Sequence, residues 1–241
     1  MSLLASREST EDVAPGRPPV PGAATGYLSA IAFLGLFVFG ILLNSVFAKG
    51  LYPMPTVPAS ETVAYRLANP EVMRISGVVN VLAGVAAIWF ASWLAAVVGR
   101  KAPGGQASWL TFAGGAISGA FLILSGAMQW VVQRPDVLAD EGLTQTVNSL
   151  IFVIGGVGVV LGYAGLVGVS SLVLVRARLI PTWLAVVGVV SGALSLVAAF
   201  GLVPEGTELV YLIPLGRFPA LLWIAIAVVF IVRRRRLTVP A

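Results

Sequence analysis

Long apolar runs alternate with short polar segments along almost the whole chain. A helix needs about 20 apolar residues to cross the hydrocarbon core of a bilayer. Six runs reach or approach that length, at 27–48, 72–99, 107–132, 148–175, 180–202 and 209–232. The pattern therefore predicts an all-α polytopic transmembrane bundle with six spans, forming one domain over residues 27–232.

Polar segments flank and interrupt this predicted domain. Residues 1–26 are rich in proline, glycine and serine, a composition typical of a disordered tail. Three prolines break the segment 50–70, where Ser60-Glu61 indicates the start of a short surface helix. Asn69-Pro70-Glu71 predicts the beginning of the second span, with Asn69 as N-cap and Pro70 in the first turn. Four arginines open the tail 233–241, as a stop-transfer anchor or as a site for anionic lipid.

The charged residues favour one orientation of the bundle. With the N-terminus inside, the inner side carries ten basic and three acidic residues, and the outer side carries five basic and seven acidic residues. Basic residues are retained on the cytoplasmic side of membrane proteins. The charges therefore predict that both termini lie in the cytoplasm.

Composition supports a membrane protein and narrows its chemistry. The chain is 58% hydrophobic and 10% charged, with a mean hydropathy of +0.97, whereas a soluble domain carries about 25% charged residues. Cysteine and histidine are absent, so thiolate and imidazole chemistry is excluded. No phosphate-binding glycine loop or nucleophile elbow occurs. We therefore expect no cofactor, no metal, no catalytic residue and no nucleic-acid partner.

Small residues recur four apart in three of the predicted spans. Glycines at this spacing lie on one helix face and allow the backbones of two helices to approach closely. This pattern predicts intramolecular helix packing, and the alternative is a dimerisation or gating helix. The pairs are Gly115 and Gly119, Gly158 and Gly162, and Gly188 and Gly192.

Strongly polar residues within the spans gather toward the outer ends. Arg217 lies about 24 Å from Arg233 along a helix, near the outer boundary of a core roughly 30 Å thick. A charge at that depth is costly and is usually paired or faces water. One hypothesis is an outward-facing site for an anionic headgroup or solute, helped by carbonyls that Pro214 and Pro219 would free. The alternative is that Arg217 snorkels to the headgroups and pairs with Glu205, Glu208 or Glu71. The candidate outer polar layer comprises Arg217, Arg74, Asn80, Asn44, Gln129 and Asn148.

Two segments resemble a known family. These are Arg178-Leu179-Ile180-Pro181-Thr182-Trp183-Leu184 followed by Gly188, and Ala220-Leu221-Leu222-Trp223-Ile224. They are similar to the fifth and last spans of small bacterial six-helix membrane proteins that are known only as a domain of unknown function. The resemblance covers about residues 70–232, and the long N-terminal segment departs from the family. It implies a six-helix fold and a bacterial inner-membrane address, and it implies no activity.

Three hypotheses about function follow. The first is a non-enzymatic accessory or scaffold subunit of the bacterial cytoplasmic membrane, whose partners are the bilayer and another membrane protein or a second copy. The second is a small permease, or a protein that binds lipid or an anionic solute, with an outward-facing polar site around Arg217. The third is an intramembrane enzyme, which requires an acidic side chain facing a pocket.

Overall fold

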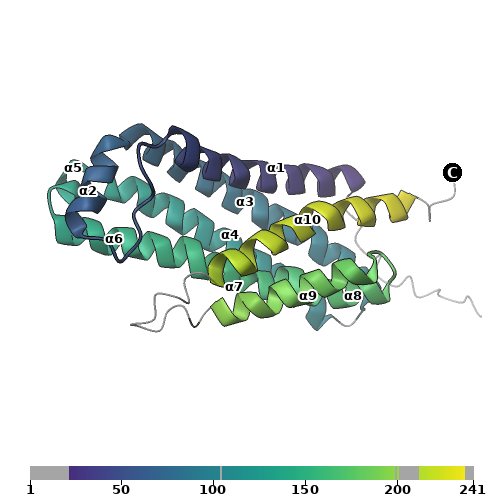
Figure 1. Cartoon of the computed structure of the whole chain (residues 1–241). Helices are drawn as coiled ribbons and strands as arrows, with labels where there is room; N and C mark the ends of the chain where they lie inside the picture. The colour runs from purple at the N-terminus through teal and green to yellow at the C-terminus, as the bar shows by residue number, and fades with distance from the viewer. Residues whose placement is uncertain (1–21, 104, 199, 201–211, 237–241) are drawn as a thin grey trace, which may run out of the picture.

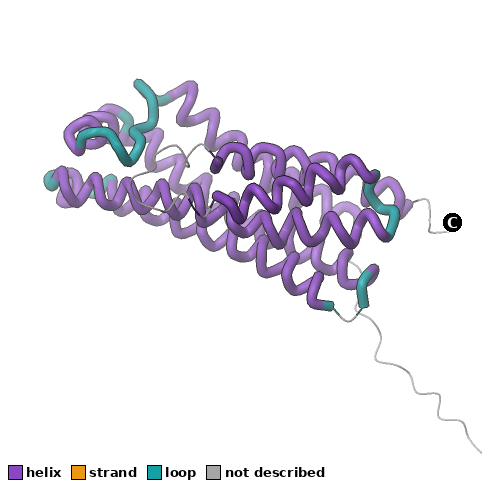
Figure 2. The backbone as a smooth tube through the Cα atoms, turned by 60° about the horizontal axis from the view of Figure 1, so that its bottom comes forward, coloured by secondary structure: helices purple, strands orange, loops and turns teal. Residues whose placement is uncertain are grey.

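The computed structural model describes residues 22–103, 105–198, 200 and 212–236, and this part of the chain is helical with short connections and without strands. Long helices run along one axis, and the connections lie at the two ends of the bundle (Figure 2). The long elements, in chain order, are α1 (Ala23–Leu42), α3 (Pro70–Lys101), α4 (Gln106–Val132), α9 (Thr182–Val197) and α10 (Leu212–Arg236).

A further long rod lies between α4 and α9 and is interrupted by π-helical turns. It consists of α6 (Glu141–Val153), η2 (Ile154–Gly158), α7 (Val159–Tyr163), η3 (Ala164–Val169) and α8 (Ser170–Arg176). A third π-helical segment, η1 (Leu43–Phe47), continues α1. Single π turns inside α-helices are uncommon and are often found at functional sites.

The helices alternate in direction, so that the first residues of α1 and the last residues of α10 lie at the same end of the bundle (Figure 1). The opposite end, which we call the loop end, consists of residues 48–69 and 133–140. Two short helices cover it, α2 (Ala59–Ala68) and α5 (Pro135–Leu138). The predicted surface helix at Ser60 is confirmed as α2.

Five helices are long and apolar enough to cross a membrane, namely Ala23–Phe47, Pro70–Lys101, Gln106–Val132, Glu141–Arg176 and Ile213–Arg234. The fifth predicted span corresponds to α9, whose 16 residues span about 24 Å. Its predicted end, and the predicted start of the last span, fall in residues 201–211, outside the described part. The structure thus shows a helical bundle with five candidate membrane-spanning helices. The sixth span and the orientation with both termini inside stay predictions.

Two predicted helix starts differ from the structure. The first span begins at Ala23 rather than at Tyr27, within the segment predicted as tail. The Thr25 and Gly26 amides donate to the Gly22 carbonyl and form the first turn, and Ala23 and Ala24 favour a helix there. The fourth begins at Glu141 rather than at Asn148. Here the Asp140 carboxylate accepts a hydrogen bond of 2.9 Å from the Leu143 amide and caps the helix, so it extends into a polar sequence.

Asn69 is the N-cap residue of α3, as the sequence predicts, but its side chain does not cap the helix. Pro70 does occupy the first turn of α3, but the Asn69 side chain makes no capping bond to that helix. Its Oδ1 accepts from the Lys49 amide at 2.6 Å, and its Nδ2 donates to the Lys49 carbonyl at 3.1 Å and to the Tyr65 carbonyl at 2.8 Å. Asn69 therefore fixes the connection after η1 against the end of α2.

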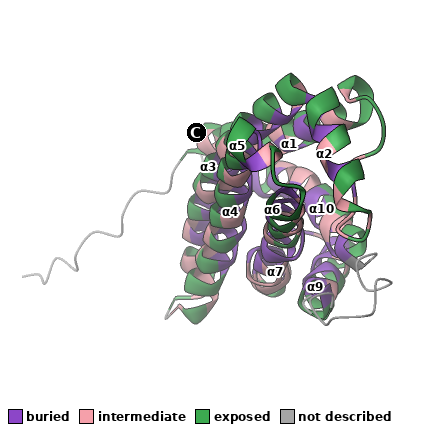
Figure 3. Cartoon of the chain, turned by 90° about the vertical axis from the view of Figure 1, so that its left-hand side faces the viewer, coloured by how far each residue is buried: buried purple, intermediate pink, exposed green. Residues whose placement is uncertain are grey.

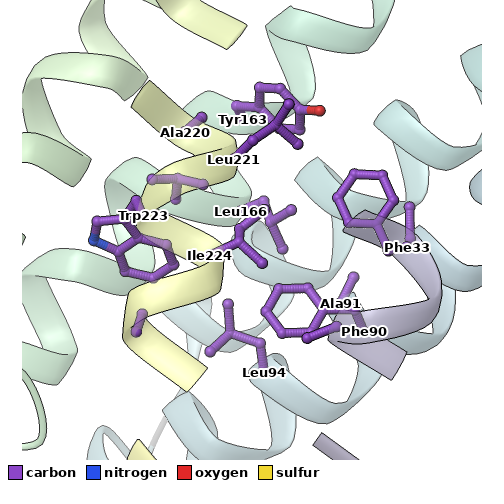
Figure 4. Close-up of a cluster of buried hydrophobic side chains, with 14 of the residues drawn as sticks. Phe33, Phe90, Ala91, Leu94, Tyr163, Leu166, Ala220, Leu221, Trp223 and Ile224 are labelled. Carbon is purple, nitrogen blue, oxygen red and sulfur yellow. The ribbon is translucent and has the colours of Figure 1, made fainter. Parts of the chain in front are cut away.

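The core lies where α3, α7, η3 and α10 meet. Phe90, Leu94, Leu166, Trp223 and Ile224 pack together there and are buried (Figure 4). Outside the core, large apolar side chains are exposed along the helices, including Trp109, Trp130 and Trp183. Exposed residues, coloured green, recur along the helices (Figure 3). A soluble monomer rarely exposes so much contiguous apolar surface, whereas a lipid-facing surface has this composition.

The glycine pairs face neighbouring helices of the same chain. A Cβ atom on Gly119 would lie 2.5 Å from the Gly84 carbonyl of α3, and one on Gly158 would lie 2.8 Å from the Phe121 ring of α4. The other four glycines also have close neighbours, which lie on α3 for Gly115, on α4 for Gly162, on α8 and α10 for Gly188, and on η3 for Gly192. These faces are occupied by intramolecular contacts, so none of the six glycines is free to build a dimer interface.

Candidate functional site: a polar cavity toward the loop end

A cavity of about 520 Å³ lies among α1, α3, α4, η2 and α10, toward the loop end. Four of the six predicted polar residues line it, so the structure brings together residues that are far apart in the sequence. The lining residues are Phe37, Gly40, Ile41, Asn44, Ser45, Tyr52, Met54, Asn80, Leu122, Ser125, Gln129, Ile151, Phe152, Gly155, Gly156, Ile213, Pro214 and Arg217. None of these side chains is acidic.

Arg217 contributes the charge of the cavity. Its Nη2 donates to the carbonyl oxygens of Gly155, at 2.5 Å, and of Gly156, at 3.2 Å. The guanidinium carbon lies 5.6 Å from the centre of the Phe37 ring, a cation–π distance. Its Nε is buried without a partner. The cation is therefore held by two neutral carbonyls and one aromatic ring, and its charge is not neutralised by a described carboxylate.

Pro214 and Pro219 suggested that carbonyls of Arg217's own helix would hold its guanidinium. The structure shows instead that the carbonyls come from another helix. Helix α10 is continuous from Leu212 to Arg236 and passes through Pro219, so the two prolines do not interrupt the helix within the described residues. The accepting residues, Gly155 and Gly156, belong to the π-helical segment η2 of the neighbouring rod. The deformation that exposes acceptors is therefore in the glycine-rich helix that faces Arg217.

The predicted alternative was that Arg217 pairs with the carboxylate of Glu205, Glu208 or Glu71, and of these three only Glu71 lies in the described residues. Arg217 and Glu71 form no ion pair, since the ion pair within the described residues is Arg134 with Asp136, both exposed. Glu205 and Glu208 lie in residues 201–211, outside the described part. The local pair that the spacing of Glu71 and Arg74 makes available is not formed either.

Two amides leave acceptor oxygens unused near the cavity. The Asn44 Nδ2 donates to the Gly40 carbonyl at 2.8 Å and to the Ser76 hydroxyl at 3.0 Å, while its Oδ1 is buried without a partner. Gln129 Oε1 is also buried without a partner. Together with Arg217 Nε, residues that line the cavity thus hold one buried donor and two buried acceptors without partners. Buried polar atoms are normally paired, so the site has unmet hydrogen-bonding capacity.

Asn148 joins a second polar cluster, next to the cavity, rather than the cavity itself. Its Oδ1 accepts from Arg66 Nη2 at 2.6 Å and from the Tyr52 hydroxyl at 3.1 Å. Arg66 Nη2 also donates to the Tyr52 hydroxyl at 3.2 Å. Tyr52 lines the cavity as well, so its hydroxyl connects the two polar groups. We call Arg66, Tyr52 and Asn148 the loop-end network.

Sequence reasoning missed Arg66 and Tyr52. Arg66 was counted only as one of the outer basic residues, yet its side chain is 0% exposed. Burial lowers the pKa of the Arg66 guanidinium from its ordinary value, and burial raises the pKa of the Tyr52 hydroxyl, an effect that the nearby Arg66 opposes. One signal was available: Arg66 lies on the same face of a short helix as Thr62 and Tyr65, at a spacing typical of a buried stripe.

Side-chain contacts fix the connection between η1 and α2 over the loop end. Gln145 Nε2 donates to the carbonyls of Pro55, at 2.9 Å, and Val57, at 3.1 Å. Its Oε1 accepts from the Thr62 hydroxyl at 2.5 Å. Tyr52 and Met54, from the same connection, line the cavity. This segment therefore forms part of the cavity wall, and α6 holds it there.

Arg74, the last of the predicted polar residues, lies in a different place. It lines a separate cavity of about 430 Å³ at the loop end, together with Arg66, Gln133, Pro135 and Leu138. The predicted outer polar layer is thus divided into three neighbouring environments: the Arg217 cavity, the loop-end network and the Arg74 cavity.

Comparison of this chain with family models, with curated proteins and with solved structures finds no match. The resemblance to a bacterial six-helix family therefore stays a prediction. Any function has to be inferred from the geometry described above. Chemically, the cavity offers a fixed cation, amide groups and apolar walls, which is a set of groups that can bind an anion.

Proposed function

We propose that this chain is an integral membrane protein that binds an anionic amphiphile, or a small anionic solute with an apolar part, in the Arg217 cavity. The observation that carries the proposal is the guanidinium of Arg217 at a cavity of about 520 Å³ whose described lining holds no acidic side chain. Of the functions considered from the sequence, this geometry supports the binding protein or small permease best.

The electrostatic argument rests on how incompletely Arg217 is neutralised. Cations in a membrane interior pair with a carboxylate, with backbone carbonyls or with water, because an unpaired charge is costly there. Arg217 has two carbonyl acceptors and the Phe37 ring, but its Nε is unused. An anion beside the guanidinium would supply the negative charge that neutralises Arg217, and it would accept a hydrogen bond from the Arg217 Nε–H.

The size and walls of the cavity favour an amphiphile as the ligand. Ligand cavities measure about 300–1,000 Å³ and are mostly apolar with a few placed polar groups. This cavity fits that range and combines polar groups with apolar walls, formed by Phe37, Ile41, Leu122, Ile151, Phe152 and Ile213. A carboxylate or phosphate head next to Arg217, with an apolar body along these walls, would match both parts.

The arrangement of the helices supports entry from the outer half of the membrane. Helices α1 and α10 lie close at the end where α1 begins and α10 ends, and they diverge toward the loop end (Figure 1). Both helices contribute to the cavity wall, through Ile41 and Asn44 on α1 and η1 and through Ile213 on α10. A ligand could therefore reach Arg217 from the loop end or between these two helices.

We further propose that the protein is not an enzyme and that it resides in a bacterial cytoplasmic membrane with both termini inside. The first part is supported by the lining of the cavity, which offers no acidic, cysteine or histidine side chain as an acid, a base or a nucleophile. The second part is supported by the distribution of basic residues in the sequence. In this orientation the loop end and the cavity face outward.

Binding of laurate, a twelve-carbon carboxylate, tests the role of Arg217. We expect the purified full chain in a neutral maltoside detergent to bind laurate and to ignore dodecanol, measured by native mass spectrometry and by the laurate-dependent rise in unfolding temperature. Arg217→Gln should weaken laurate binding about 10- to 100-fold, because a charge-assisted hydrogen bond contributes about 1.5–3 kcal/mol.

Arg134→Gln is the matched control, because Arg134 is an exposed arginine of the loop end that does not line the cavity. It should leave laurate binding unchanged. Equal binding by the wild-type chain and Arg217→Gln would contradict the proposal. Co-purification of a stable heteromeric complex that binds neither probe would instead support the accessory-subunit hypothesis.

Thiol labelling tests the outward orientation, since the chain has no cysteine of its own. In intact cells, we expect a membrane-impermeant maleimide to label Ser45→Cys, at the cavity mouth, and Arg217→Cys, and not Lys101→Cys at the other end. Lys101→Cys should react only after the membrane is permeabilised. Labelling of Lys101→Cys alone in intact cells would reverse the orientation, and protection of Arg217→Cys alone would show that the cavity is closed to water.

A further inference from the structure

The second cavity, at the loop end, is lined by two arginines. It measures about 430 Å³ and lies where α2 meets the starts of α3 and α5. Arg66 comes from α2 and Arg74 from the first turns of α3, and both belong to the lining together with Gln133. No acidic residue is among the lining residues that the structure describes. The described lining thus includes two cationic residues, of which Arg66 is buried, and no carboxylate.

Arg66 has unused donors although it is completely buried. Only its Nη2 is bonded, to the Asn148 amide oxygen and the Tyr52 hydroxyl, while Nε and Nη1 are buried without a partner. A guanidinium has five N–H donors, and leaving some of them unsatisfied in a buried position is costly. The arrangement is therefore incomplete as a purely internal network.

The other polar residues that line the cavity, Arg74 and Gln133, supply no negative charge. Arg74 is exposed and forms no ion pair with Glu71, although the two residues are three apart on α3. Gln133 is used structurally, because its Nε2 lies within 3.3 Å of the Pro70 carbonyl and 3.5 Å of the Arg66 carbonyl. This bond fixes the end of α2 and the start of α3, and so it positions both arginines.

The position of the cavity along the bundle indicates the chemistry of its ligand. Pro70 is the first residue of one candidate span, and Gln133 follows directly after Val132, the last residue of another. The cavity therefore lies at the boundary of the apolar zone, the depth at which the phosphates of lipid headgroups are found. Arginine is the side chain best suited to phosphate, because its planar fork matches the phosphate oxygens.

We propose that the cavity between Arg66 and Arg74 binds a phosphate group, either the headgroup phosphate of a membrane lipid or a free phosphate. Arg74 provides the accessible cation, and Arg66 provides a buried cation that is held in place by Tyr52 and Asn148. This site is separate from the Arg217 cavity and does not depend on the function proposed for it.

The experiment measures phosphate binding to the full chain in maltoside detergent. The probes are dihexanoyl phosphatidylglycerol, the neutral dihexanoyl glycerol that lacks the phosphate, and inorganic phosphate. Native mass spectrometry and the unfolding temperature report binding. We expect the wild-type chain to bind the phosphatidylglycerol and not the neutral lipid, and Arg74→Gln to weaken that binding about tenfold.

Arg74 is the residue to replace, because it is exposed and its loss should leave the fold intact, whereas loss of the buried Arg66 would disturb the loop-end network. Arg134→Gln removes an equal charge from the same end of the bundle outside the cavity, and it should bind like the wild-type chain. All measurements are repeated with Arg217→Gln, so that lipid bound in the other cavity does not contribute. The effect of Arg74→Gln should persist there.

The two sources of phosphate give different results. Displacement of the lipid by millimolar inorganic phosphate would assign the site to free phosphate, and binding of the lipid without such displacement would assign it to a headgroup. Equal losses in Arg74→Gln and Arg134→Gln would overturn the proposal, because binding would then reflect the general surface charge. It would also be overturned if neither probe distinguished the wild-type chain from Arg74→Gln, since water would then satisfy Arg66.

Discussion

Gly162→Ala is expected to destabilise the bundle by about 3 kcal/mol, because a single added methyl group has no space where α7 crosses α4. The new Cβ would lie 2.8 Å from the Ser118 amide nitrogen and still closer to the Gly114 carbonyl oxygen. Both are backbone atoms, so the two helices would have to separate. Separation would also weaken the hydrogen bond of 2.7 Å from the Ser118 hydroxyl to the Val159 carbonyl.

Gly35→Ala is the matched control for this substitution. Gly35 lies inside α1, and a Cβ at this position would have no atom within 4 Å. The same glycine-to-alanine change should here stabilise the helix by about 0.5–1 kcal/mol, because alanine restricts the unfolded chain. Unfolding by sodium dodecyl sulfate, followed by tryptophan fluorescence, measures both effects. Effects of the same sign would show that the α4–α7 crossing is not as close as described.

Asn148→Leu is expected to destabilise the loop end by about 3 kcal/mol. The Asn148 oxygen is the acceptor for both Arg66 Nη2 and the Tyr52 hydroxyl, and leucine removes it while keeping the number and the branching of the side-chain heavy atoms. Arg66 would then be a buried cation whose described side-chain partner is only Tyr52. Removing one member of a buried charged cluster is costly for this reason. Denaturation followed by far-UV circular dichroism measures the loss.

The double variant Arg66→Met with Asn148→Leu distinguishes a lost cation partner from a general packing defect. If the cost of Asn148→Leu comes from the uncompensated Arg66 charge, removal of that charge should restore most of the stability. Each single variant should then be less stable than the double variant. Additive losses would contradict the interpretation and would show that Asn148 and Arg66 act independently. Proteolysis of the loop end provides a second measure, because the network holds the connection that carries Tyr52.

The sequence indicated several members of the site because charge and amide groups within apolar helices are rare. Arg217, Asn44, Asn80 and Gln129 stood out by their depth alone, and all four line one cavity. Asn148 and Arg74 stood out for the same reason but lie in neighbouring environments. Depth along a helix can be counted from the sequence. The direction in which a residue faces around the helix axis depends on which helices are its neighbours.

Arg66 and Tyr52 could not be identified in the same way. Both lie outside the spans, where an arginine or a tyrosine is ordinarily exposed, so depth along a span says nothing about them. The signal for Arg66 was only its spacing from Thr62 and Tyr65. Only the packing of α2 against α6 buries Arg66 and aligns it with Asn148, a residue 82 positions away. Similarly, no local sequence pattern predicts the π-helical turn at Gly155, whose carbonyl accepts a hydrogen bond from Arg217.

The sequence by itself determined the class of this protein, since runs of about 20 apolar residues can satisfy their backbone in lipid only as helices. It also determined where most helices begin and end, and which glycines allow close approach. The tertiary structure decided which polar residues share a cavity, and that the carbonyls at Arg217 come from η2 rather than from α10. These depend on the rotation and crossing of helices, which are set by contacts such as Gly114 against Gly162 between distant parts of the chain.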